Sequence, residues 1–162
     1  MLIVALAIGS RIHQFDTEKG FTPIIDASSK NDIIGVEGAL ATACYVYGNW
    51  LKALDYISIK YGSDDGDLSL NGRLIDVKNG RDCRYGSLLI PRKQWCKRRY
   101  DFYVKCGNLG EEWVRIWGYA SKAQLEEKGF WKDYGYGDTF TLLLKDLSDI
   151  NGLNDKTLAK DA

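Results

Sequence analysis

Residues 66–78 read Gly-Asp-Leu-Ser-Leu-Asn-Gly-Arg-Leu-Ile-Asp-Val-Lys. The Asn71-Gly72 pair between two apolar runs is a strong signal for a β-hairpin, because both central positions of the tight turn need positive φ angles. The sequence therefore predicts two short antiparallel strands, with Asp67 at the start of the first.

The second strand of this hairpin is expected to present two different faces. Side chains alternate along a strand, so Leu74, Asp76 and Lys78 share one face while Ile75 and Val77 take the other. Two residues along a strand span roughly 7 Å, which lets the Asp76 carboxylate and the Lys78 ammonium address one small ligand. The alternative is a surface salt bridge, worth less than about 1 kcal/mol.

A long helix is predicted before the hairpin. The segment Ser29-Lys30-Asn31-Asp32 offers N-cap residues for a helix of about twenty residues. Its apolar stripe at helical spacing is Ile33, Val36, Leu40, Ala43, Cys44, Tyr47, Trp50, Leu51 and Leu54. Glu37 falls within this stripe, where an unpaired carboxylate is costly, so it needs a cation, a metal or a proton. The alternative is a structural glutamate paired with an arginine.

The rest of the chain reads as short strands with one more helix. Strands are expected at residues 86–91, 101–106, 112–120 and 140–144, with a basic connector at 92–99. A capping box at Ser121–Gln124 begins a short helix that ends near Gly129. The predicted fold is an α/β protein with a mixed sheet and a helix packed on it. Residues 1–150 are expected to form a single domain, followed by a flexible tail at 151–162.

Charge is segregated along the chain although the net charge is zero. Of 22 Lys/Arg and 22 Asp/Glu residues, ten basic and three acidic ones lie between Arg73 and Lys105, which leaves twelve basic and nineteen acidic ones elsewhere. Such segregation favours a basic surface that faces a polyanion, and the alternative is a solvated face of mixed charge. Within this basic segment, Trp95 and Tyr100 fit core packing better than base stacking.

The cysteines and the apolar runs of the sequence indicate the cellular compartment and the kind of metal site that is not expected. The four cysteines form no Cys-x-x-Cys pair and no histidine lies near them, so a zinc site is not expected. Nothing indicates that they pair, which fits a reducing cytoplasm. The apolar run at residues 1–9 is too short to span a bilayer, so no membrane association is expected.

Three carboxylates are expected to meet near one lysine. Asp67 and Asp76 come from adjacent strands, and Glu37 comes from the helix predicted to lie across them. Carboxylates that share a small space repel one another unless a cation lies between them. Because all of these ligands are oxygens, they favour Mg²⁺ or Mn²⁺, which in turn favours a phosphate-containing substrate.

The pattern Glu37 … Asp67 … Asp76-Val77-Lys78 resembles the PD-(D/E)XK nuclease superfamily. The order of later elements is similar to that of small phage or virus-type and resolvase-like members, so the likeness covers about residues 32–150. This resemblance implies a restriction-endonuclease-like core, with a central mixed sheet flanked by helices. It departs from the family name at the position before Asp67, where Gly66 stands in place of proline.

The resemblance also implies an activity and a role for each residue. The protein would be a metal-dependent endonuclease that hydrolyses DNA phosphodiester bonds. Asp67, Asp76 and the Val77 carbonyl would ligate Mg²⁺ or Mn²⁺, with Glu37 completing the metal shell. Lys78 would orient or help deprotonate the attacking water and stabilise charge in the transition state.

Seven basic side chains are candidates for contacts to the DNA backbone. They are Arg81, Arg84, Arg92, Lys93, Lys97, Arg98 and Arg99. One alternative is a non-catalytic nucleic-acid-binding module on the same fold, and another is an enzyme that acts on a different small anionic substrate. A junction resolvase would be a symmetric homodimer, because two matched cuts need two sites.

Overall fold

The computed structural model describes residues 29–48, 67–80, 86–97, 99–109, 113–135 and 137–153. Four strands form a mixed sheet, here called sheet A, in the order β1-β2-β4-β5. Their bounds are β1 (Leu68–Leu70), β2 (Arg73–Lys78), β4 (Phe102–Leu109) and β5 (Trp113–Ser121). β4 runs parallel to β2 and antiparallel to β5. The predicted α/β class with a mixed sheet is confirmed, and the restriction-endonuclease-like core stays a prediction.

The predicted hairpin is confirmed at the turn itself. β1 and β2 pair antiparallel from Leu68↔Ile75 to Leu70↔Arg73. Asn71 and Gly72 have φ angles of 50° and 78°, as a tight two-residue turn requires. The hairpin therefore forms where the local sequence places it.

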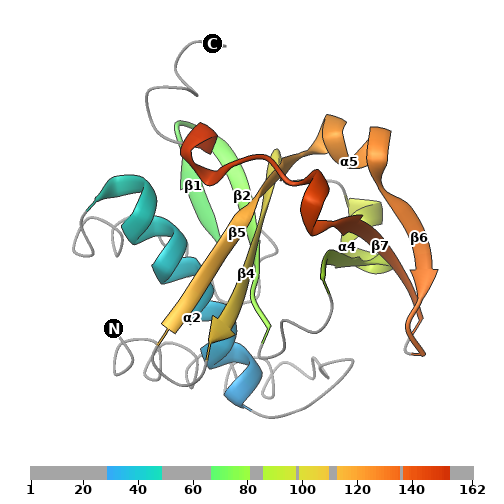
Figure 1. The fold of residues 1–162 in the computed structure, drawn as a ribbon, viewed down its shortest axis with the longest axis horizontal. Coiled ribbons are helices and arrows are strands. Elements are labelled where there is room, and N and C mark those ends of the chain that lie inside the picture. Colours follow the sequence, from blue (N-terminus) through green and yellow to red (C-terminus); the bar gives the residue numbers. More distant parts are fainter. Residues whose placement is uncertain are drawn as a thin grey trace.

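Helix α2 (Ser29–Tyr47) packs on one face of sheet A, as Figure 1 shows. Its 19 residues match the predicted length, and Gly48 follows in the left-handed conformation that commonly ends a helix. Val36, Leu40 and Ala43 are buried, as the apolar stripe predicted. The part of the stripe beyond Gly48 lies outside the described residues.

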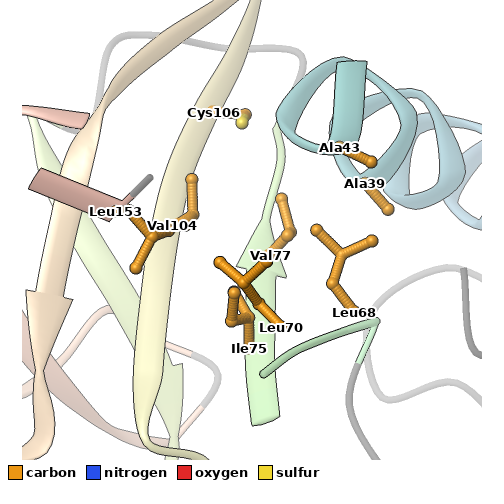
Figure 2. Close-up of a cluster of buried hydrophobic side chains, with 9 residues drawn as sticks. All are labelled: Ala39, Ala43, Leu68, Leu70, Ile75, Val77, Val104, Cys106 and Leu153. Atoms are coloured by element: carbon orange, nitrogen blue, oxygen red, sulfur yellow. The ribbon is translucent and has the colours of Figure 1, made fainter. Parts of the chain in front are cut away.

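The first core, called cluster 1, lies between α2 and sheet A. Figure 2 shows Ala39 and Ala43 of the helix near Leu68 and Val77 of the sheet. The buried members of the cluster are Ala39, Ala43, Leu68, Leu70, Ile75, Val77, Val104, Cys106 and Leu153. Ile75 and Val77 thus point toward α2, so the alternation of strand β2 directs Asp76 and Lys78 to the opposite face.

Three further strands form a second, antiparallel sheet, called sheet B, in the order β3-β7-β6. Their bounds are β3 (Ser87–Pro91), β6 (Phe130–Asp133) and β7 (Asp138–Leu143), and two short helices are α4 (Arg92–Lys97) and α5 (Lys122–Lys128). Sheet B lies on the side of sheet A away from α2 (Figure 1). The second core, called cluster 2, joins the two sheets and contains Leu88, Ile90, Trp95, Tyr100, Tyr103, Ala120, Leu125, Phe140 and Leu142.

The expectation of one central sheet was wrong, because the strands divide between two. β3 pairs with β7, which lies far along the chain, from Ser87↔Leu143 to Pro91↔Thr139. Local patterns indicate strands but not their distant partners, so the division could not be inferred. Strand β6 was not predicted, and the expected connector at 92–99 contains α4.

Two local predictions near the C-terminal end had different outcomes. The predicted N-cap is confirmed, since the Ser121 hydroxyl accepts a hydrogen bond from the Gln124 N–H at 3.2 Å. The reciprocal half of the capping box is not formed, because the Gln124 side chain donates to the Asp146 carbonyl and accepts from the Ser148 hydroxyl. The predicted start of a flexible tail at 151 was too early. Two 3-10 helices, η1 (Leu144–Asp146) and η2 (Ile150–Leu153), continue the fold, and Leu153 is fully buried in cluster 1.

Candidate metal and phosphate site

The hairpin brings Asp67 and Asp76 together at the end of β1. The Leu68↔Ile75 register places Asp67 next to Asp76, and the Asp67 N–H donates to the Ile75 carbonyl at 3.0 Å. Asp67 Oδ2 accepts a hydrogen bond from the Val77 N–H at 2.6 Å. Asp67 directly precedes the first residue of β1. Its carboxylate accepts a backbone N–H of β2 there, and this hydrogen bond fixes the position of the carboxylate.

Asp76 is a buried carboxylate that has a cationic partner but too few hydrogen bonds. Only 5% of the residue is exposed, and its Oδ2 lies 2.6 Å from Lys78 Nζ. That oxygen accepts no well-oriented hydrogen bond within the described part of the chain. A buried charge normally needs both an opposite charge and hydrogen bonds. Asp76 therefore has the chemistry of a ligand oxygen that a cation would satisfy.

The pKa of Asp67 reports the crowding of negative charge. Burial is the main cause and the Asp76 charge the next, and together they raise the pKa of Asp67 to about 7. The Lys78 charge and the hydrogen bond from the Val77 N–H act in the opposite direction. The single Lys78 charge thus does not offset the repulsion between the Asp67 and Asp76 carboxylates. A divalent cation between them would relieve this repulsion.

The donor set suits a hard divalent cation. Mg²⁺ in proteins keeps several waters and takes one or two carboxylates, to which substrate phosphates add. Asp67 and Asp76 supply the carboxylates. The N–H and C=O of one residue in a strand point to the same edge, so the Val77 carbonyl points to the edge where its N–H meets Asp67. That Asp67, Asp76 and Val77 bind Mg²⁺ stays a prediction.

Glu37 comes from helix α2 and not from the hairpin. Among the described residues, no set of three or more His, Cys, Asp or Glu side chains could hold a metal ion. Helix α2 packs on the Ile75 and Val77 face of the sheet, whereas Asp76 points to the other face. Glu37 is half-buried on α2, and its predicted part in the metal shell stays a prediction.

Two residues near the site were not predicted to belong to it. Lys105 of β4 is buried and lies directly opposite Lys78 in the parallel register. Tyr100 is buried at the start of β4, and burial followed by the charges of Asp76 and Asp67 raises the pKa of its hydroxyl. The missing signal was the parallel pairing of β2 with β4, which aligns Asp76 with Tyr103 and Lys78 with Lys105.

The predicted phosphate-binding residues have mixed placements. Arg92, Lys93, Lys97 and Arg99 are exposed on or just after α4. Arg92 Nη1 lies 2.6 Å from Asp138 Oδ2, so its charge is already paired. Arg81, Arg84 and Arg98 lie outside the described residues.

The two aromatic side chains of the basic segment belong to the core. Trp95 anchors α4 by stacking on Phe140, with ring centroids 3.9 Å apart. Tyr100 packs edge-to-face on Tyr103 at 5.7 Å. Neither ring is available for base stacking, as the sequence indicated.

A scan against protein-family models and searches of curated proteins and of solved structures found no match to this chain. Across the described ranges, no helix is long and apolar enough to cross a membrane.

Proposed function

We propose that this protein is a Mg²⁺-dependent endonuclease that hydrolyses DNA phosphodiester bonds. The observation that carries the proposal is the buried Asp76 carboxylate beside Asp67. Its Oδ2 lies 2.6 Å from Lys78 Nζ and accepts no hydrogen bond from a described residue. Carboxylates of this kind on two neighbouring strands, followed by a lysine, also form the pattern that resembles the PD-(D/E)XK superfamily. The proposal includes a restriction-endonuclease-like core.

Asp67 and Asp76 would hold the cation, with the Val77 carbonyl as a further ligand. A bound divalent cation supplies positive charge to the phosphoryl oxygens and lowers the pKa of a ligated water. The chain's own contribution is to hold the ligands in place. Asp67 is fixed by the Val77 N–H, and Asp76 is held in β2 by the pairing of β2 with β4 in sheet A.

Lys78 would act on the attacking water and on the phosphate. Its ammonium lies 2.6 Å from Asp76, and 19% of its side chain is exposed, so it connects the buried carboxylate to solvent. With a cation held by Asp67 and Asp76, the Lys78 ammonium would be able to bind a phosphate oxygen. Positioned cations of this type stabilise the charge that develops in the transition state.

The test is cleavage of plasmid and branched DNA with Mg²⁺, for the wild type, Asp76→Ala and Lys78→Ala. We expect a loss of about 100-fold or more in each variant, since each removes a preorganised charge from the site. Asp138→Ala is the matched control, because Asp138 is an exposed strand carboxylate with its own cationic partner. A chelator should abolish wild-type activity. Activity that survives both site substitutions would sink the proposal.

A non-catalytic nucleic-acid-binding module is the second candidate. The observation that favours it is that the described residues contain no group of three or more His, Cys, Asp or Glu side chains that could hold a metal ion. This candidate requires salt-sensitive DNA binding without cleavage and with no response to a chelator. The same assay series therefore separates the two candidates.

A further inference from the structure

An open strip of aromatic and basic side chains continues the face of sheet A that carries the proposed site. Its members are Trp113, Arg115 and Trp117 on β5, which alternate with the inward-facing Val114 and Ile116. Val114 and Ile116 pack against cluster 1, on the α2 side. The strip therefore faces away from α2, on the same side as Asp76 and Lys78.

The strand register joins the strip to the site. Lys78 is paired with Lys105 on β4, and β2 ends there. Beyond Lys105, β4 and β5 continue as a two-stranded ribbon (Figure 1). In this ribbon Gly107 is paired with Arg115 and Leu109 with Trp113. Four residues of strand span roughly 13 Å, so the strip begins beside the two lysines and reaches about that far from them.

The chemistry of the strip is that of a base-stacking surface. Trp113 is 71% exposed, the largest exposure of any bulky apolar side chain in the described residues. The Arg115 guanidinium lies over the Trp117 ring, 4.0 Å from its centroid. Arg115 is exposed and forms no ion pair with a described residue. Tryptophan rings with arginine planes bind unpaired bases without regard to sequence.

We propose that the strip of Trp113, Arg115 and Trp117 binds single-stranded DNA next to the Asp67–Asp76–Lys78 site. The inference rests on the proposed function and names its substrate class as DNA with an unpaired segment beside the cleaved bond. Duplex DNA cannot use the strip in this way, because its bases are already stacked within the helix. Arg115 offers positive charge for the phosphates of the same strand.

The test measures binding without cleavage. A fluorescein-labelled oligothymidine and a blunt hairpin duplex are titrated in EDTA with the full-length protein and its variants, and fluorescence anisotropy is recorded. We expect Trp113→Ala and Arg115→Gln each to weaken oligothymidine binding about tenfold, and to change duplex binding less. Trp113→Phe should keep most of the affinity because it keeps an aromatic face. Phe130→Ala, which removes an exposed ring on sheet B, is the matched control and should bind as the wild type.

The outcomes separate this inference from the proposed function. Unchanged oligothymidine binding in Trp113→Ala, with circular dichroism as in the wild type, overturns the inference even if cleavage depends on Asp76. Loss of binding in the strip variants supports it even if no cleavage is found, in which case the nuclease proposal falls alone. A change of oligomeric state in Trp113→Ala without a change in DNA binding assigns the strip to a protein interface and also overturns the inference.

Discussion

Asp76 and Lys78 form an ion pair in which the carboxylate is buried and the lysine side chain is partly exposed. The Asp76 side chain is 7% exposed and the Lys78 side chain 19%, while the Arg92–Asp138 pair has the same 2.6 Å separation at 66% and 47% exposure. The two ion pairs therefore differ in interaction energy although their distances are equal. Solvent screens the exposed Arg92–Asp138 pair more strongly than the buried Asp76–Lys78 pair. The two pairs form a natural comparison within one molecule.

Removing the lysine charge should destabilise the fold far more than removing the arginine charge. In Lys78→Met the Asp76 carboxylate stays buried without its cation, and we expect the free energy of unfolding to fall by about 2 kcal/mol or more. In Arg92→Met the expected loss is below about 1 kcal/mol. Urea denaturation at pH 7 measures both. Equal losses would show that Asp76 is less buried than the structure indicates.

Asp67 predicts a pH dependence of stability with a definite sign. Its pKa is raised from 3.8 to about 7, chiefly by burial and then by Asp76, so the native state holds this proton more tightly than the unfolded state. Its contribution to stability is therefore complete below about pH 4 and declines as the pH rises to about 7. Asp67→Asn should lack this decline and be more stable than the wild type at pH 8.

Urea denaturation at pH 5 and pH 8 is the measurement. The asparagine keeps a carbonyl oxygen for the Val77 N–H, so the comparison isolates the charge. A wild type and an Asp67→Asn variant that change in parallel between the two pH values would contradict the assignment of the raised pKa to Asp67.

At the scale of elements, one close contact fixes α2 against the end of β2. A Cβ atom built on Gly38 would lie 2.6 Å from the Asn79 Cβ, so the helix approaches the strand at a position where only glycine fits. Asn79 directly follows Lys78, and its Nδ2 donates to the Ile34 carbonyl at 2.7 Å. The helix thus positions the chain immediately after the lysine of the proposed site.

Two glycines of the same helix should respond in opposite ways to alanine. Gly38→Ala must push α2 away from β2, and we expect it to destabilise the protein by about 1–3 kcal/mol. Gly35→Ala meets no atom within 4 Å and should stabilise the helix by roughly 0.5–1 kcal/mol. Thermal unfolding followed by circular dichroism tests both. Similar effects of the two substitutions would refute the close contact at Gly38.

The sequence predicted the elements whose signals are local. The Asn71-Gly72 turn and the Ser121 cap each depend on a few adjacent residues, and both are present. Strand β6 was missed because its four residues, Phe130–Asp133, are all exposed and show no alternation of apolar and polar side chains. Asp67, Asp76 and Lys78 could be placed together from the hairpin alone. Lys105 could not be placed there, because no local sequence signal predicts that β4 pairs with β2.

At the scale of the whole molecule, cluster 2 holds the two sheets to each other. Tyr103 and Ala120 come from sheet A, whereas Leu88, Phe140 and Leu142 come from sheet B. The cluster also carries Tyr100, which lies close enough to Asp76 and Asp67 for their charges to raise its pKa. The face of sheet A that carries the two carboxylates thus lies next to the packed core between the sheets.

The shared core predicts that both sheets unfold in one transition. Leu142 is fully buried, and Leu142→Ala should lower the free energy of unfolding by about 2–5 kcal/mol. Phe130→Ala, on the same sheet but exposed, should cost less than about 1 kcal/mol. Amide hydrogen exchange should report the Leu142→Ala loss equally in β4 and in β7. A loss confined to sheet B would mean that the two sheets are separate cooperative units.

The claim on which the functional account rests is that Asp67 and Asp76 hold a divalent cation, and calorimetric titration with Mg²⁺ tests it without any choice of DNA substrate. We predict that the wild type and the control Asp138→Asn bind Mg²⁺ at pH 8 and that Asp76→Asn does not. Binding should weaken as the pH falls below about 7, because a proton then competes for Asp67. A wild type that binds no Mg²⁺ or Mn²⁺, or an Asp76→Asn variant that binds them equally well, would contradict the account.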